Sequence, residues 1–162
     1  MANGAASWSF TPDDDRAIAS VLQRFLHESG ARCAMLVDRS GQLVTVAGDR
    51  PSFDPVTFAT LTAADFSAND QLARLIGETE FNTLFHQGER ESMLLADVAR
   101  RVILVALFDA RTTLGLVRLR LRGAVEELGA LFEGIFARGT QPEVVPPSLF
   151  ADADDEIDRL FQ

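Results

Sequence analysis

Lysine is absent from this 162-residue chain, and cysteine occurs only once, at Cys33. All fifteen basic residues are therefore arginines, which indicates a bias in codon composition rather than fifteen positions that each need a guanidinium. A single cysteine excludes an internal disulfide and a metal site built from several cysteines. The surrounding sequence "CAMLV" is apolar, so we expect the Cys33 side chain to be an inert part of the core.

Long apolar runs are also missing, and none could span a membrane. The opening residues "MANGAASWSF" lack the basic start of a signal peptide. We therefore expect a cytoplasmic protein that does not insert into membranes. The length indicates one domain with tails, and 47% hydrophobic residues suffice for a proper core.

The charge balance is acidic, with a formal net charge of −9. More than half of it lies in residues 139–162, which hold six acidic residues and one arginine. A nucleic-acid partner is not expected, because binding to phosphates requires a basic footprint.

Motifs for catalysis and cofactor binding are missing too. The chain has no phosphate-binding loop of the Walker type, no G-x-G-x-x-G and no G-x-S-x-G, and neither His27 nor His86 is paired with a cysteine at a diagnostic spacing. The aspartates near the end lack the glycine and glutamate of an EF-hand loop. We expect no catalytic residues, no metal and no cofactor, and hence a protein that is not an enzyme.

Three helices are predicted. The first begins with Thr11 as cap, Pro12 in the first turn and Asp14 completing an acidic capping box, and it ends at Ser29-Gly30. The second runs from Asp54-Pro55 to about Gly77, and the third begins near Gly123.

Two stripes of the second predicted helix differ in character. Large apolar residues predict its core stripe: Phe58, Leu61, Ala68, Leu72 and Leu75. The other stripe is mostly small and polar: Thr57, Thr60, Ala64, Ser67, Gln71 and Arg74. Small side chains on this second stripe would let a partner approach closely. Phe66 belongs to neither stripe, and either burial or an interface would explain it.

Five strands are predicted, at residues 31–38, 43–48, about 90–97, 101–108 and 113–121, with residues 78–90 as a loop. In the last strand "LVRLRLR" alternates, with Arg118, Arg120 and Arg122 on one face. A solvated strand face explains these arginines better than an anion site. The order αββαβββα indicates an α+β domain whose sheet neighbours joined by hairpins are antiparallel.

The strand "SMLLADV" follows a loop and is the candidate sheet edge: Ser92, Met93, Leu94, Leu95 and Ala96. A free apolar edge promotes association unless another strand pairs with it. Self-pairing in a two-fold homodimer is the simplest arrangement.

We expect the end of the sequence to form a unit that is separate from the domain. The boundaries are a tail at 1–10, a domain at 11–138, a linker with three prolines at 139–152 and an acidic amphipathic helix at 153–162. Ile157, Leu160 and Phe161 would share one face of that helix. It either folds back on its own domain or recognises another protein.

Several of these segments together resemble the roadblock family, in particular its bacterial MglB type: "LVDRSGQLV", "LTAADFSANDQLARLIGE", "FHQGERESM", "VILVALFDARTTLGLVRLRL" and the ending "DDEIDRLF". The resemblance implies a five-stranded antiparallel sheet with one helix on one side and two on the other. It also implies a homodimer with a continuous sheet, paired through the third strand. The chain departs from this pattern at Ala64 and Asp65, where relatives tend to carry Gly and Asn.

The resemblance further implies a partner: a Ras-like GTPase of the MglA type, bound by two copies of this chain. The GTPase would contact the central helix at Thr60, Ala64, Ser67, Ala68 and Gln71. The acidic helix would form a second contact through Asp154, Asp155, Ile157, Asp158, Leu160 and Phe161. The implied role is acceleration of GTP hydrolysis without an arginine finger, in cell polarity or gliding, with a location at a cell pole.

Two other functions stay open. A roadblock scaffold would tether a GTPase or a complex without changing hydrolysis. A small-ligand sensor would need polar groups that converge inside the core, whereas the predicted inner faces are almost wholly apolar. Fold alone does not decide among the three.

Overall fold

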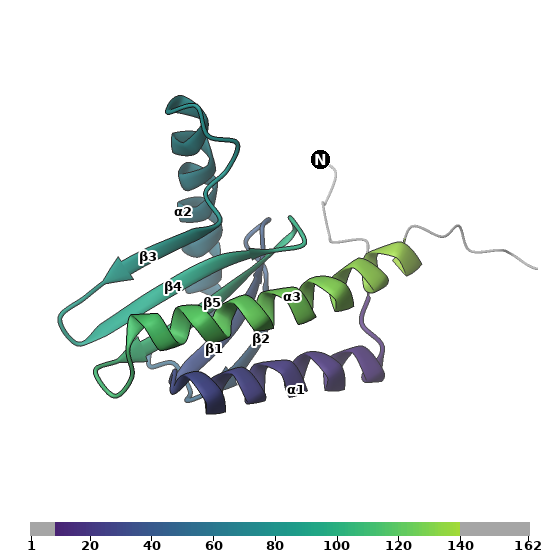
Figure 1. Cartoon of the computed structure of the whole chain (residues 1–162). Coiled ribbons are helices and arrows are strands. Elements are labelled where there is room, and N and C mark those ends of the chain that lie inside the picture. Colours follow the sequence, from purple (N-terminus) through teal and green to yellow (C-terminus); the bar gives the residue numbers. More distant parts are fainter. Residues whose placement is uncertain (1–8, 140–162) are drawn as a thin grey trace, which may run out of the picture.

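The computed structural model describes residues 9–139 (Figure 1). Apart from Ser9, Phe10 and Gly139, the predicted tail 1–10, linker and acidic helix lie outside the described residues. The elements follow in the order α1 (Pro12–Ser29), β1 (Cys33–Asp38), β2 (Leu43–Gly48), α2 (Pro55–Leu75), β3 (Thr83–Gln87), β4 (Glu91–Val98), β5 (Val102–Asp109) and α3 (Leu114–Gly139).

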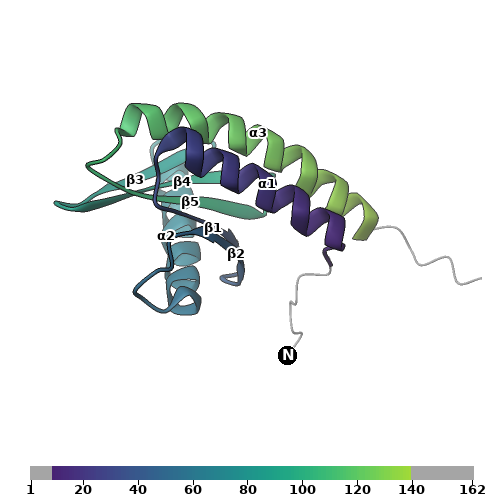
Figure 2. The same ribbon diagram turned by 90° about the horizontal axis from the view of Figure 1, so that it is seen from below.

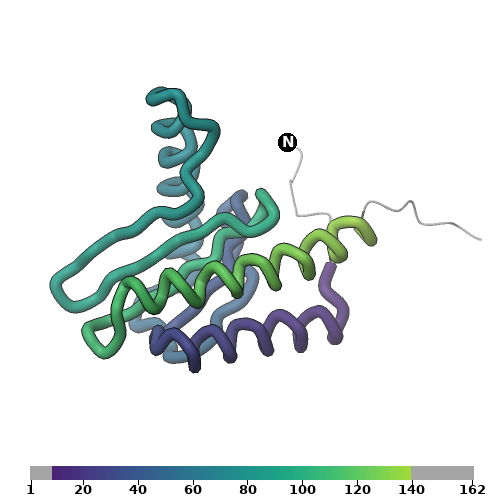
Figure 3. Tube along the Cα trace, in the orientation of Figure 1, coloured from purple at the N-terminus to yellow at the C-terminus, as the bar shows by residue number. Residues whose placement is uncertain are grey.

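The five strands form one antiparallel sheet in the order β2-β1-β5-β4-β3. Helices α1 and α3 lie side by side on one face, and α2 lies alone on the other (Figures 2 and 3). The α+β class, the order αββαβββα and the division into two helices and one helix are therefore confirmed.

The predicted helix starts are confirmed for α1 and α2. Thr11 accepts a hydrogen bond from the backbone N–H of Asp14, whose carboxylate in turn accepts one from the N–H of Thr11. Gly30 ends α1 in the left-handed conformation. Asp54 caps α2, and Pro55 occupies its first position.

Two segments were assigned the wrong secondary structure. Residues 113–121 are not a strand but the start of α3, and β3 lies inside the predicted loop. Buried residues in α3 follow helical spacing from the outset, with Val117, Leu121, Ala124 and Leu128 inside. Because the helix rotates by about 100° per residue, the alternating arginines do not share one flat face.

The predicted sheet edge was also wrong. Strand β4, which contains Ser92, Met93, Leu94, Leu95 and Ala96, pairs with β3 on one side and with β5 on the other. Its backbone groups are therefore used within the sheet, and the free edges are β2 and β3. The apolar character of β4 reflects burial in the middle of the sheet rather than an unpaired edge.

The two faces of the sheet are packed differently. The face under α1 and α3 carries the larger core, which includes Leu22, Phe25, Leu36 and Phe132. The core under α2 is smaller, and Phe66 is the largest side chain that α2 contributes to it, only 1% exposed. Cys33 is buried there, as expected. No helix in the described part is long and apolar enough to cross a membrane.

Candidate functional site

Helix α2 buries a different face from the one that the sequence predicted. The residues that α2 buries against the sheet are mostly small: Ala59, Thr62, Ala63, Phe66, Asn69 and Ala73. The predicted core stripe is wrong, because Leu61, Leu72 and Leu75 point to solvent and Phe58 is only partly buried. Size misled the prediction: the largest apolar side chains of a helix are normally its buried ones.

Four large apolar side chains are conspicuous on this outer side. Leu61 is 64% exposed, Leu72 58%, Leu75 82% and Ile76 70%. Leu61, Leu72 and Leu75 are separated by eleven and three residues, so they lie along one line of the helix. Large exposed apolar side chains that gather in this way make the outer side of α2 a candidate interaction site.

The predicted contact residues lie beside that line and are all exposed: Thr60, Ala64, Ser67, Ala68 and Gln71. We name these five residues together with Leu61, Leu72, Leu75 and Ile76 the α2 outer face. Its middle is made of small side chains, and its upper end is apolar and protrudes beyond the sheet (Figure 1). The sequence predicted the exposure of the small residues but not that of the leucines, and the GTPase contact of the small residues stays a prediction.

Arg39 joins α2 to the sheet. Its guanidinium donates to Asp70 of α2 at 2.8 Å and to Asp97 of β4 at 2.5 Å, and it lies 5.2 Å from the ring centroid of Phe66. Burial alone would lower the pKa of Arg39, but the hydrogen bonds and charges of Asp97 and Asp70 outweigh it and raise the pKa. Residues from a turn, a strand and a helix are thus joined at one cation.

Two further polar contacts involve α2, one at its start and one near its middle. Asp54 accepts hydrogen bonds from the backbone N–H groups of Val56 and Thr57 and from the Thr57 hydroxyl, and these bonds lower the pKa of Asp54. Near the middle of the helix, His86 of β3 lies 2.6 Å from Asp65. His86 lies in the segment that was predicted to be a loop, and no contact was expected for it.

The edge strand β3 lies next to this site in the chain. A short segment, residues 76–82, connects the end of α2 to Thr83. On the α2 side of the sheet, Leu84 packs on the smaller core and His86 holds Asp65. The free edge of the sheet and the α2 outer face are therefore contributed by consecutive elements.

Two kinds of predicted site remain, a metal site and the contact residues of the acidic helix. Within residues 9–139, no group of three or more His, Cys, Asp or Glu side chains is placed to hold a metal ion. The predicted contact residues of the acidic helix lie outside the described residues: Asp154, Asp155, Ile157, Asp158, Leu160 and Phe161.

Known proteins are similar to this chain in architecture and in sequence. The pattern of the Roadblock/LC7 domain matches residues 6–108. MglB of Myxococcus xanthus is 44% identical with a TM-score of 0.70, over 72% of this chain and 95% of that one. The gliding protein MglB of Thermus thermophilus is 34% identical with a TM-score of 0.73, over 79% and 97%. An MglB structure with a tetrameric arrangement is 34% identical with a TM-score of 0.72, over 79% and 96%.

Proposed function

Since the chain belongs to the Roadblock/LC7 family and is MglB-like over most of its length, we propose that it regulates a Ras-like small GTPase of the MglA type. The regulation consists of faster GTP hydrolysis on the bound GTPase. The protein itself supplies no catalytic group. The process it serves is cell polarity or gliding motility, with the protein concentrated at a cell pole.

One observation carries this proposal: the α2 outer face exposes leucines and small residues side by side. Apolar side chains this exposed favour coverage by another protein. Small residues such as Ala64 and Ser67 allow the backbone of a partner to approach α2 closely. The combination suits a flat protein surface better than a small molecule, which needs a concave pocket.

A homodimer is the second part of the proposal. The free edge of β3 pairs with the β3 of a second copy, which extends the sheet and removes the exposed edge. This pairing brings the two α2 helices to the same face of the joined sheet. Leu72 and Leu75 then contribute to the contact between helices, and the remaining outer faces receive one GTPase.

Hydrolysis is accelerated by positioning. Phosphoryl transfer needs little covalent help from protein groups, so ordering the GTPase's own switch segments accounts for much of the rate. A surface that is itself rigid is suited to that task, and α2 is joined to other elements of the domain by the contacts Arg39–Asp70 and His86–Asp65.

Residues 153–162 provide a second contact with the GTPase. Ile157, Leu160 and Phe161 enter an apolar groove, and the neighbouring acids meet a basic rim. Removing residues 150–162 is expected to leave most of the hydrolysis effect intact, but to weaken binding and slow nucleotide exchange. Unchanged exchange together with a lower melting temperature of the isolated protein would contradict this second contact.

The deciding experiment measures GTP hydrolysis by an MglA-type GTPase with and without this protein. Ser67→Arg and Gln71→Arg are expected to abolish binding and acceleration, because a bulky charge blocks close approach. Ser20→Arg and Gln23→Arg introduce the same changes at exposed positions of α1 and serve as matched controls. Binding without faster hydrolysis would identify a scaffold instead, and full activity of both α2 variants would place the contact elsewhere.

The dimer is tested by sedimentation at micromolar concentration, where a mass near twice 17.7 kDa is expected. Leu75→Glu places a charge at an 82% exposed position, so the fold persists while the dimer weakens. Leu119→Glu, at a 60% exposed position of α3, is the control. A monomeric parent protein would contradict the composite surface.

A further inference from the structure

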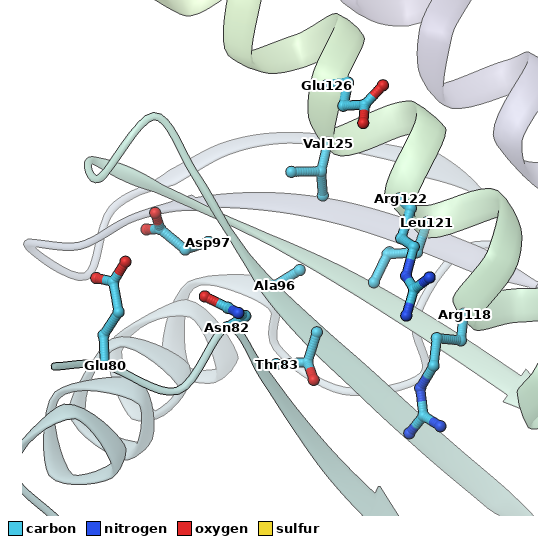
Figure 4. Close-up of a pocket in the computed structure, with 10 residues that line it drawn as sticks. All are labelled: Glu80, Asn82, Thr83, Ala96, Asp97, Arg118, Leu121, Arg122, Val125 and Glu126. Atoms are coloured by element: carbon cyan, nitrogen blue, oxygen red, sulfur yellow. The ribbon is translucent and has the colours of Figure 1, made fainter. Parts of the chain in front are cut away.

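An open groove of about 540 Å³ lies on the opposite face of the sheet from α2, between α3 and the edge strand β3 (Figure 4). Its apolar wall is formed by Ala96, Leu121 and Val125, and Thr83 stands on β3. The groove exists because α3 packs over β4, whereas β3 lies further out at the edge of the sheet.

Charge is divided between the two ends of this groove. Arg118 and Arg122 extend from α3 at one end, while Glu80 and Asp97 lie at the other with Glu126 above them (Figure 4). Within residues 9–139, no carboxylate lies within ion-pair distance of Arg118 or Arg122. Asp97 is already bound by Arg39, so the acidic end is partly neutralised.

Arg120 on the same helix differs from Arg118 and Arg122, because it forms an ion pair within the domain. Arg120 lies between these two in sequence but points to α1, where its guanidinium is 3.6 Å from Glu28. Arg118 and Arg122 are four residues apart, so their side chains stand about 6 Å apart along one side of α3. They form an exposed cationic pair beside an apolar wall.

We propose that this groove holds residues 153–162 of the same chain in the isolated protein. That segment, which we name the acidic segment, carries four acidic residues, Asp154, Asp155, Glu156 and Asp158, together with one arginine and three large apolar residues. Asp154 and Asp158 are four residues apart, as Arg118 and Arg122 are. Ile157 and the pair Leu160-Phe161 supply apolar surface, and Arg159 supplies a cation for the acidic end of the groove.

The length of the chain allows this docking. Helix α3 ends at Gly139, and Arg118 lies 21 residues before it, or about 32 Å at 1.5 Å per residue. The thirteen residues 140–152 reach about 40 Å at about 3.1 Å each in a Pro-rich extended chain. The acidic segment can therefore reach the cationic end of the groove and run back along it.

Tethering explains why a short segment would stay there. A segment joined to its own site by a linker of this length has an effective concentration in the millimolar range, so weak intrinsic affinity suffices. The docking does not depend on the proposed GTPase, because the groove and the α2 outer face lie on opposite faces of the sheet.

A spin label on Gln162→Cys in the full chain tests the docking. Cys33 can stay in place, because burial raises the pKa of its thiol and shields it from the reagent. The nitroxide is expected to broaden the amide signals of Thr83, Leu121 and Val125, but not those of Ser20 and Gln23 on α1. Absence of broadening at the groove would overturn the proposal.

Charge exchange tests the chemistry of the contact. Arg118→Glu with Arg122→Glu is expected to abolish the broadening, and adding Asp154→Arg and Asp158→Arg is expected to restore it. Arg120→Glu on the same helix is the control and leaves the broadening in place. The neutral pair Arg118→Gln and Arg122→Gln gives the same answer if the charge reversal disturbs the fold. Broadening that survives both pairs would contradict the proposed site.

The source of the segment is resolved by mixing. Spin-labelled chains without isotope are combined with ¹⁵N chains that carry no label. Docking within one chain predicts that Leu121 and Val125 of the ¹⁵N chains are broadened much less in the mixture than when those chains carry the label themselves, because in the proposed dimer a labelled partner holds its segment in its own groove across the β3 seam. Comparable broadening in the two samples would show that a second copy supplies the segment, and this would overturn docking within the chain.

Discussion

Nε2 of His86 lies 2.6 Å from Oδ2 of Asp65, which joins the edge strand β3 to the middle of α2. Asp65 occupies a position where the resemblance led us to expect Asn. The two side chains are 43% and 38% exposed, so this is a surface contact rather than a buried one. It connects the two elements that the proposed dimer and the proposed GTPase contact both need.

The first prediction concerns this pair. Asp65→Ala, His86→Ala and the double variant form a cycle whose coupling free energy is expected to be about 0.2–1 kcal/mol, as for half-exposed ion pairs. Urea unfolding measures the coupling. Hydrogen exchange is expected to quicken at Leu84 of β3 in either single variant, since that strand loses a tether. Strictly additive effects with unchanged exchange would show that the contact contributes nothing.

The second prediction concerns catalysis. Arg50→Ala, Arg90→Ala and Arg111→Ala are expected to lower GTP hydrolysis only as far as they lower binding. Arg111 is already held by Asp109, with Nε 3.0 Å from Oδ1. An arginine finger contributes about 10³-fold or more in rate. Single-turnover hydrolysis at saturating protein measures this, and a loss of that size with intact binding would identify a finger.

The third prediction contrasts two glycines. Gly48 has a φ of +89°, and a Cβ there would lie 2.3 Å from the carbonyl oxygen of Arg32, so Gly48→Ala is expected to destabilise the protein by more than about 2 kcal/mol. Gly123 lies inside α3 with nothing within 4 Å of a built Cβ. Gly123→Ala is expected to stabilise the protein by about 0.5–1 kcal/mol. Urea midpoints that move in the same direction would contradict this.

The fourth prediction concerns pH. Hydrogen bonds from Thr57 and Val56 lower the pKa of Asp54 from its ordinary value of 3.8. A carboxylate whose pKa is lower in the folded state stabilises the fold above its unfolded pKa, and this contribution disappears as pH falls through the folded value. Asp54→Asn can still cap α2 but cannot titrate. Its free energy of unfolding is therefore expected to fall less steeply below about pH 4 than that of the parent protein.

Urea unfolding at a series of pH values from about 5 to about 2.5 measures the difference. Asp14 and Asp109, whose pKa values are also lowered by hydrogen bonds, titrate in both proteins and cancel in the comparison. Parallel pH profiles of the two proteins would show that the charge of Asp54 does not contribute to folding.

Local signals in the sequence predicted most of the fold. Thr11, Gly30 and Asp54 mark helix ends through backbone hydrogen bonds that involve only nearby residues, so they can be read without a structure. Such signals do not depend on what packs against them.

Two errors have a different cause. A single sequence does not show what packs against a given side chain. Leu119 made residues 113–121 look like an alternating strand, but it is 60% exposed on α3. Leu61, Leu72 and Leu75 looked like core residues of α2 for the same reason. A large apolar side chain indicates contact with something, and the sequence does not say whether that contact is within the chain or outside it.

The edge of the sheet was misplaced because β3 is short and only partly apolar. Thr83 and Gln87 are exposed, and His86 reads as a loop residue until its partner Asp65 is placed beside it. The apolar strand β4 was the more visible candidate. Edge strands are commonly short and polar, which makes them the hardest strands to find.

Arg39 has a consequence for motion. The face that α2 presents to the sheet is made mostly of small residues, and Phe66 is the one large side chain that this face buries fully. A slide by one turn would carry Asp70 about 5.4 Å away from Arg39, beyond the reach of a hydrogen bond. Arg39 therefore opposes a displacement of α2 along the sheet. A partner that binds the α2 outer face then binds a surface whose position is already fixed.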